Sequence, residues 1–217
     1  MRWSNSGRGT RESKGSSKTD AQMIECLKRQ DEHAFLALYD QHRIPVYRFL
    51  MYMTGSTTTA EELTQEVFIR ILDAMSSGAI GQFDSNKGTL EGYLLGIARN
   101  LSREERRKTH RLVSLDDILD LAEGSQLPVQ NGMTWDAAQR LIEHAELALL
   151  YRAILGLPEH YREVLVLCSL QEKSYQEAAL ILRCSEGTIA SRMNRAKALI
   201  SAKLRRSAPD EANLNAI

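Results

Sequence analysis

Apolar residues recur at intervals of three and four along most of the chain, which is the spacing that places side chains on one face of a helix. The recurrence starts directly after Asp20 and runs to Gly55 in three segments. The apolar stripes of these segments are Met23, Ile24 and Leu27; Phe35, Leu38 and Tyr39; and Val46, Phe49, Leu50 and Met53. The sequence contains no alternating run of β-branched residues, so it predicts an all-α fold.

Two pairs of residues have the spacing of a capping box, in which a hydroxyl and a carboxylate satisfy the first N–H groups of a helix. Thr59 and Glu62 predict that a helix opens there, with Ala60, Leu63, Val67 and Ile71 on its buried face. Ser174 and Glu177 predict a second, shorter helix nearer the C-terminus.

A stripe of glycine and arginine lies opposite the apolar stripe of the helix that begins near Leu90. Its members are Gly92, Gly96, Arg99 and Arg103, continued by Arg106 and Arg107. A glycine inside a helix costs about 1 kcal/mol relative to alanine, so two in one stripe indicate that another body approaches this face closely. A nucleic-acid backbone and a neighbouring helix are both compatible with the pattern.

The C-terminal segment has the pattern of a helix-turn-helix. The helix opened by Ser174 is followed by a turn over residues 183–186, and Ser185 is placed to cap a longer helix. That helix turns Ile189, Met193, Ala196 and Ile200 inward and Thr188, Ser191, Arg192 and Arg195 outward. Many helical hairpins share this apolar pattern, so the charge of the outer face must decide whether it binds DNA.

Charge is distributed unevenly although the 28 basic and 28 acidic residues cancel. Residues 187–206 contain no acid and six bases, namely Arg192, Arg195, Lys197, Lys203, Arg205 and Arg206. A basic run can be a solvated helical face, but on the second helix of a helix-turn-helix it favours binding to DNA phosphates and base edges. Residues 1–19 form a basic stretch with little to bury, which predicts a disordered tail.

Several other classes of function lack sequence support. Cys26, Cys168 and Cys184 are far apart, and the five histidines show no ligand spacing, so neither a metal site nor a cofactor is expected. No glycine-rich phosphate loop, nucleophile motif or cluster of carboxylates indicates an enzyme. No stretch approaches 18 apolar residues and the N-terminus has no apolar core, which predicts a cytoplasmic protein without membrane insertion.

Five motifs resemble those of the extracytoplasmic-function (ECF) subfamily of sigma-70 RNA polymerase sigma factors. LPEHYREVLVL (157–167), SYQEAALIL (174–182) and SEGTIASRMNRAK (185–197) resemble region 4 of that family, and AEELTQEVFIRIL (60–72) and YLLGIARN (93–100) resemble region 2. The resemblance implies a factor that binds core RNA polymerase, recognises the minus-35 and minus-10 promoter elements and helps to open promoter DNA. A stand-alone helix-turn-helix regulator is the alternative, but it leaves residues 60–72 unexplained.

The resemblance also implies three contact surfaces. Contacts with the β′ clamp helices of the polymerase are expected from Glu62, Leu63, Gln65, Glu66, Phe68 and Ile69. Contacts with the melted minus-10 strand are expected from Phe83, Asn86, Lys87, Arg99, Asn100, Arg103, Arg106 and Arg107. Contacts with minus-35 duplex are expected from Thr188, Ser191, Arg192, Asn194, Arg195 and Lys197, while the apolar surface of region 4 leans on the β flap.

The implied organisation is two small helical domains joined by a flexible linker. The expected segments are the tail 1–19, the region 2 domain 20–108, an acidic linker 109–140, the region 4 domain 141–206 and a C-terminal tail 207–217. An anti-sigma factor clamped between the two domains is a further expected partner. Ala190 stands where the family often has a polar residue, so a minus-35 sequence preference cannot be carried over to this chain.

Overall fold

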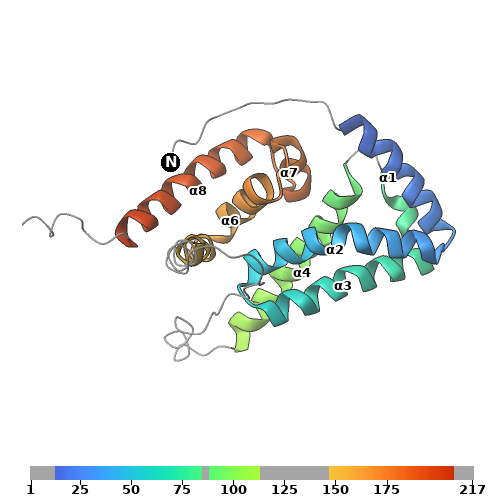
Figure 1. Ribbon diagram of the computed structural model, residues 1–217, viewed down its shortest axis with the longest axis horizontal. Helices are drawn as coiled ribbons and strands as arrows, with labels where there is room; N and C mark the ends of the chain where they lie inside the picture. The colour runs from blue at the N-terminus through green and yellow to red at the C-terminus, as the bar shows by residue number, and fades with distance from the viewer. Residues whose placement is uncertain (1–12, 85–87, 113–146, 208–217) are drawn as a thin grey trace, which may run out of the picture.

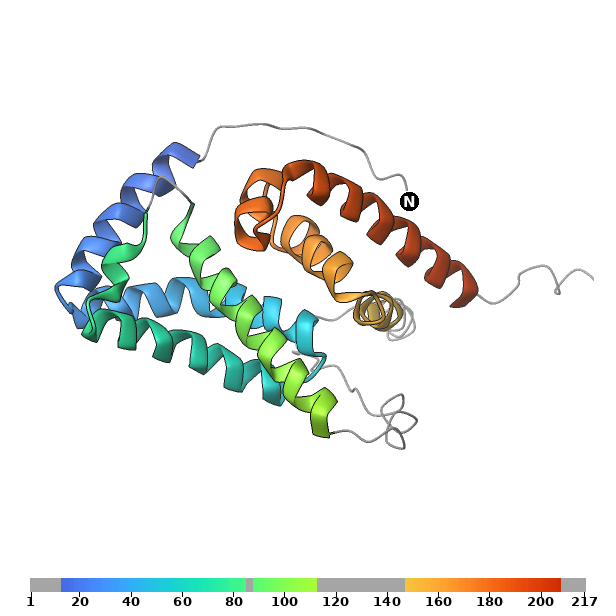
Figure 2. The same cartoon turned by 180° about the vertical axis from the view of Figure 1, so that it is seen from behind.

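The computed structural model describes residues 13–84, 88–112 and 147–207. Every regular element in these ranges is helical, which confirms the all-α prediction. The N-terminal half (residues 13–112) contains α1 (Ser13–Lys28), α2 (Glu32–Thr54), α3 (Thr57–Ser76), the 3-10 turn η1 (Ala79–Gln82) and α4 (Leu90–Leu112). The C-terminal half (residues 147–207) contains a helix over 147–155, α6 (Glu159–Leu165), the π-helical segment η4 (Val166–Leu170), α7 (Tyr175–Leu182) and α8 (Glu186–Ser207). The C-terminal half lies against α2 and α4, with α8 on its outer edge (Figures 1 and 2).

One of the two capping boxes forms as predicted. Ser174 Oγ accepts the N–H of Glu177 at 3.2 Å, and the Glu177 carboxylate accepts the N–H of Ser174 at 2.8 Å. The prediction for Thr59 is wrong, because Ser56 caps α3 and its Oγ accepts the N–H of Thr59 at 3.3 Å. Three hydroxyl residues follow Ser56, so the sequence offers several candidate caps and only the backbone geometry selects one.

The first helix starts earlier than the sequence predicts. Residues 13–19 belong to α1, although residues 1–19 are expected to be disordered from their composition. Helical hydrogen bonding extends outward from a packed segment without needing apolar side chains, so composition alone underestimates its length. The packed segment here includes Asp20, which is buried and whose Oδ2 accepts the N–H of Leu90 at 2.8 Å.

The remaining predicted boundaries fall partly outside the described residues. The linker expected over 109–140 begins as helix, because α4 runs to Leu112, and its remainder lies outside the described residues. Residues 1–12 of the N-terminal tail, residues 141–146 and residues 208–217 of the C-terminal tail also lie outside them.

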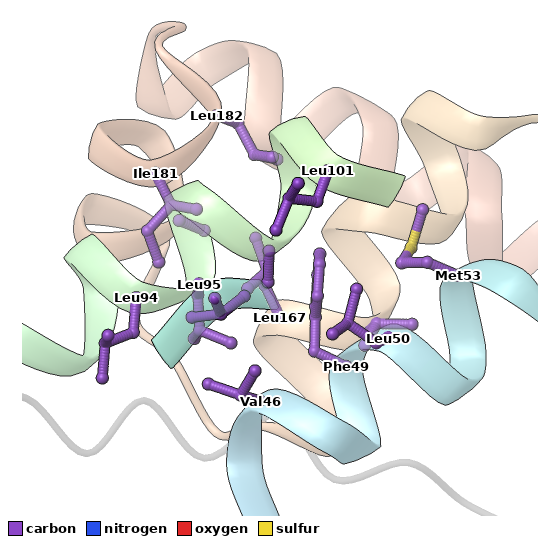
Figure 3. Close-up of a cluster of buried hydrophobic side chains, with 14 of the residues drawn as sticks. Val46, Phe49, Leu50, Met53, Leu94, Leu95, Leu101, Leu167, Ile181 and Leu182 are labelled. Carbon is purple, nitrogen blue, oxygen red and sulfur yellow. The ribbon is translucent and has the colours of Figure 1, made fainter. Parts of the chain in front are cut away.

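Buried apolar side chains form a single cluster that extends through both halves. Figure 3 shows Val46, Phe49, Leu50 and Met53 of α2 and Leu94, Leu95 and Leu101 of α4 together with Leu167, Ile181 and Leu182. Burial of apolar surface stabilises by about 25 cal/mol per Å² removed from water, so this cluster helps to hold the two halves together. The helices expected as two separate domains are therefore packed on one another.

The C-terminal end of α2 receives hydrogen bonds from the other half. The last four carbonyls of a helix lack an intrahelical partner and need donors from elsewhere. The hydroxyl of Tyr151 donates to Met51 O at 3.2 Å, and the guanidinium of Arg162 donates to Met53 O at 2.9 Å. These bonds fix the C-terminal half at one end of α2.

Candidate nucleic-acid interface

The outer face of α8 is the surface predicted to read duplex DNA. Ser185 caps the helix by accepting the N–H of Thr188 at 3.2 Å, which confirms the predicted start. Ile189, Met193 and Ala196 are buried, as predicted, and hold the helix against the rest of the half. The opposite face carries exposed Ser191, Asn194, Arg195 and Lys197, with Thr188 and Arg192 half-buried beside them.

The turn between α7 and α8 gives the pair its helix-turn-helix geometry. Arg183 ends α7 in the left-handed conformation, with a φ of 54°. The N–H of Cys184 then donates to Ala179 O at 3.0 Å, which closes the end of α7 and reverses the chain within a few residues. The second helix is thereby presented with its basic face outward.

The glycine stripe of α4 faces both a helix and an open groove. A Cβ atom built on Gly92 would lie 3.6 Å from Cγ1 of Ile181 in α7, so a neighbouring helix packs at this position. A Cβ built on Gly96 would meet nothing within 4 Å. Gly96 instead borders a groove of about 500 Å³ lined by Phe83, Asp84, Gly88, Thr89, Gly92, Tyr93, Gly96, Ile97, Arg99, Asn100, Glu177, Leu180, Ile181 and Arg183.

The predicted minus-10 residues are only partly brought together. Phe83 is half-buried and its ring meets that of Tyr93 edge to face, with the centroids 5.6 Å apart, and both residues line the groove. Asn100 and Arg107 are exposed along α4. Asn86 and Lys87 lie outside the described residues.

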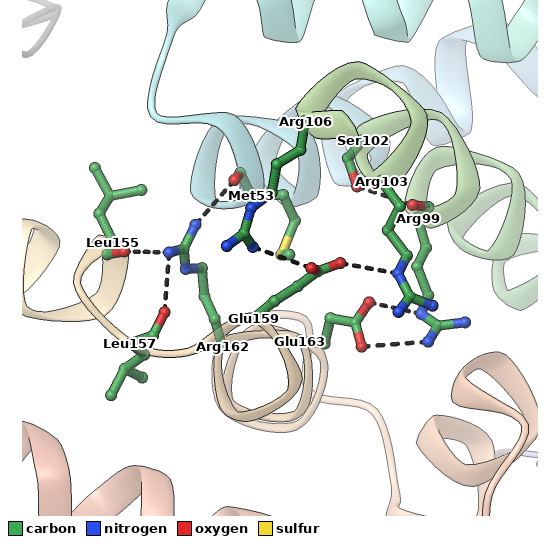
Figure 4. A network of polar contacts seen from close by, with 10 residues as sticks. All are labelled: Met53, Arg99, Ser102, Arg103, Arg106, Leu155, Leu157, Glu159, Arg162 and Glu163. Atoms are coloured by element: carbon green, nitrogen blue, oxygen red, sulfur yellow. Dashed lines mark hydrogen bonds and ion pairs between the residues drawn. The ribbon is translucent and has the colours of Figure 1, made fainter. Parts of the chain in front are cut away.

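Three arginines of α4 that are predicted to bind the strand have protein partners in this arrangement (Figure 4). Arg99 Nε lies 2.7 Å from Oε1 of Glu163. Arg103 Nε lies 2.9 Å from Oε1 of Glu159, and Arg106 lies 3.0 Å from Oε2 of the same carboxylate. The two glutamates, which belong to α6, were not expected at this site. Their one signal in the sequence is a spacing of four, which puts both on one helical face.

The face of α3 predicted to meet the polymerase is mostly available. Glu62, Gln65 and Ile69 are exposed, and Leu63 and Glu66 are half-buried. Phe68 is the exception, because it is only 3% exposed and packs edge to face on the rings of Phe35 and Tyr39. Its assignment as a surface contact is therefore wrong. Leu72, which the sequence analysis did not include, is 42% exposed one turn beyond Ile69, where helical spacing extends the exposed face.

Burial shifts the pKa of several groups behind these surfaces. Burial lowers the pKa of His42, and the nearby Glu91 and Asp20 carboxylates oppose that shift. Burial also raises the pKa of the Cys168 thiol to about 11, so this cysteine remains a protonated and unreactive thiol at neutral pH.

Among the described residues no group of three or more potential ligands could hold a metal ion, and no described helix is both long and apolar enough to cross a membrane.

Comparisons with known proteins match both halves of the chain to one protein family. Residues 38–112 match the family model for sigma-70 region 2, and residues 147–200 match the model for sigma-70 region 4. The ECF RNA polymerase sigma factor SigM of Bacillus subtilis is 34% identical over 174 residues, which cover 80% of this chain and 97% of SigM.

Two solved structures share the fold at 22% sequence identity. CnrH in complex with the cytosolic domain of CnrY has a TM-score of 0.62 and covers 87% of this chain and 99% of its own. Sigma factor RpoE in complex with the anti-sigma factor NepR from Bartonella quintana has a TM-score of 0.59 and covers 80% of this chain and 98% of its own. On the strength of the two family models and SigM, this chain belongs to the ECF sigma factors of the sigma-70 family and acts in the initiation of transcription at promoters.

Proposed function

We propose that this sigma factor reads minus-35 duplex through the outer face of α8. The proposed contacts are Thr188, Ser191, Arg192, Asn194, Arg195 and Lys197. The observation that supports this most directly is an acid-free, solvent-facing stripe on a helix whose opposite side is buried. The major groove admits one such helix, and the fork of an arginine can donate to two acceptors on one guanine.

The melted minus-10 strand is proposed to bind along α4. Arg99, Arg103, Arg106 and Arg107 supply positive charge over more than two helical turns, and Asn100 supplies hydrogen-bonding groups. The aromatic side chain of Phe83 lies at the groove and offers a surface on which an unstacked base can pack. Asn86 and Lys87 belong to the same proposed site on the strength of the family resemblance.

Core RNA polymerase is proposed to dock on the exposed face of α3. The contacts are Glu62, Leu63, Gln65, Glu66 and Ile69, with Leu72 replacing the buried Phe68. Region 4 is proposed to rest on the β flap. Residues 20–108 and 141–206 are the two proposed functional domains, joined by the acidic linker 109–140, and the protein is proposed to act in the cytoplasm without enzymatic activity of its own.

An anti-sigma factor is proposed as a regulatory partner. The structural neighbour RpoE was solved in complex with an anti-sigma factor, and this chain has a groove of about 500 Å³ lined by residues of α4 and α7. Co-purification of a bound protein from the native host tests this partner.

Transcription from a promoter by core polymerase plus this chain tests the DNA and polymerase contacts. We expect promoter-dependent transcripts with the wild-type chain. Arg192→Ala and Arg195→Ala should each weaken discrimination between minus-35 sequences by about 1 to 3 kcal/mol if the side chain contacts a base edge.

Arg205→Ala is the matched control, because it removes the same charge from an exposed position near the end of α8. It should lower affinity about equally for all sequences. Unchanged minus-35 selectivity in both Arg192→Ala and Arg195→Ala would reject the assignment of α8. A chain that binds duplex but ignores core polymerase would reject the contact at α3.

A further inference from the structure

Acids from the C-terminal half cover the basic face of α4. The guanidinium of Arg99 donates from two nitrogens to the two oxygens of Glu163, at 2.7 and 3.4 Å. The side chain of Arg99 is 12% exposed and that of Glu163 is 2% exposed. An ion pair this deeply buried is held in one geometry, because neither charge can be left without its partner at this depth.

A second carboxylate extends the contact by one turn. Glu159 forms ion pairs with two arginines: its Oε1 lies 2.9 Å from Nε of Arg103, and its Oε2 lies 3.0 Å from Nη1 of Arg106 (Figure 4). Glu159 and Glu163 therefore form a short row of anionic oxygens along α6 that matches three arginines on α4. A phosphate presents the same charge-assisted, bidentate acceptor to an arginine as a carboxylate does. The row of carboxylates occupies the arginine donors that a strand backbone would use.

In the arrangement described here, which we call closed, the C-terminal half packs on α2 and α4. This closed arrangement is incompatible with contact to both promoter elements. The minus-35 and minus-10 elements are about 25 base pairs apart, which is about 85 Å of duplex at 3.4 Å per base pair. Helix α7 packs on both α8 and α4, so the two proposed DNA-binding surfaces are separated by a single helix. The packing diameter of a helix is only about 10 Å. The halves must therefore separate before both elements are bound.

We propose that Glu159 and Glu163 act as an internal mimic of the DNA backbone that holds the sigma factor closed until the halves separate. This inference rests on the proposed role of α4 in strand binding. In the closed form Arg99, Arg103 and Arg106 are paired with the carboxylates, and in the open form the same guanidinium groups are free to pair with phosphates. Closed molecules do not bind the strand, so the apparent affinity is the intrinsic affinity multiplied by the open fraction.

Binding of a fluorescent single-stranded oligonucleotide to the full chain, without polymerase, tests the mimic. Glu163→Gln and Glu159→Gln each remove one negative charge from the proposed mimic and leave every proposed DNA-binding residue intact. We expect each to bind the strand on the order of tenfold more tightly than the wild type. Small-angle X-ray scattering of the same samples should show a larger radius of gyration.

Glu172→Gln is the matched control. It makes the same change in charge at an exposed position of the C-terminal half, so it measures the general effect of one fewer negative charge. Because Glu163 is buried, Glu163→Gln must first be shown to be folded by circular dichroism. Glu159, whose side chain is 24% exposed, provides a second variant with less risk to the fold.

Both readouts must change for the inference to stand. If Glu159→Gln and Glu163→Gln bind the strand no more tightly than Glu172→Gln, the mimic is refuted. Tighter binding without expansion would also refute it, since the acids would then act only by local repulsion. If neither the wild type nor any variant binds the strand even in complex with core polymerase, the proposed role of α4 fails, and the inference fails with it.

Discussion

Truncation of Leu167 tests whether the two halves unfold as one unit. Leu167 is fully buried and belongs to the same apolar cluster as Phe49 of α2 and Leu95 of α4 (Figure 3). Leucine-to-alanine changes at such positions cost about 3 kcal/mol, because transfer free energy and packing are both lost. For a chain of this size each kcal/mol lowers the melting temperature by about 3 °C, so Leu167→Ala should lower it by about 9 °C.

Differential scanning calorimetry of the full chain is the assay. A shared core predicts a single transition that moves with a truncation in either half, so Phe49→Ala should shift the same peak as Leu167→Ala. Leu36→Ala is the control, because Leu36 is 57% exposed on α2 and its truncation should change stability by less than about 0.5 kcal/mol. Two transitions, of which Leu167→Ala moves only one, would refute the reasoning and show that each half has an independent core.

Four further predictions concern single residues of the N-terminal half. Asp20→Ala should lower the free energy of unfolding by about 1 to 2 kcal/mol, because the buried N–H of Leu90 loses its acceptor, and Asp20→Asn should restore most of it in urea titrations. Phe68→Ala should cost about 3 to 5 kcal/mol of stability. Ile69→Ala should leave stability nearly unchanged and weaken binding to core polymerase in a titration. Burial lowers the pKa of His42, so the folded chain binds this proton less readily than the unfolded chain, and stability should fall as the pH drops below about 6.5. His42→Gln should flatten that part of a pH series, and an unchanged slope would contradict the assignment.

The positions that the sequence predicts correctly are those where one local rule decides. Leu27, Leu38, Val67 and Ile189 are fully buried, as their three-and-four spacing predicts, because only one face of each helix can turn toward a core. Phe68 follows Val67 on the same helix and is buried as well, because aromatic rings of α2 widen the apolar stripe. The width of a buried stripe depends on the neighbouring helix, which periodicity does not identify.

The pairing of the two halves could not be predicted in the same way. The glycine and arginine stripe of α4 left a nucleic-acid backbone and a helix as alternatives, and the structure places a helix at Gly92 and open space at Gly96. Nothing in the sequence distinguishes Glu163 from a glutamate on the exposed face of a helix, yet it is one of the most buried charges in the described chain. Periodicity marks which residues are buried, whereas the identity of a partner 64 positions away depends on tertiary packing.

Arg99, Arg103 and Arg106 pair with carboxylates in the closed arrangement, whereas in the promoter-bound arrangement the same guanidinium groups are proposed to pair with phosphates. If 99% of the molecules were closed, the apparent affinity for the strand would fall about 100-fold, or about 2.7 kcal/mol. Only a partner that binds the open form more tightly can offset such a deficit. The exposed face of α3, with Ile69 and Leu72, is not covered by the C-terminal half, so core polymerase can dock there before the halves separate. Contacts that polymerase makes only with the separated halves would then supply the free energy of separation. In this order, polymerase docks on α3 first, the two halves separate second, and α4 binds the minus-10 strand third.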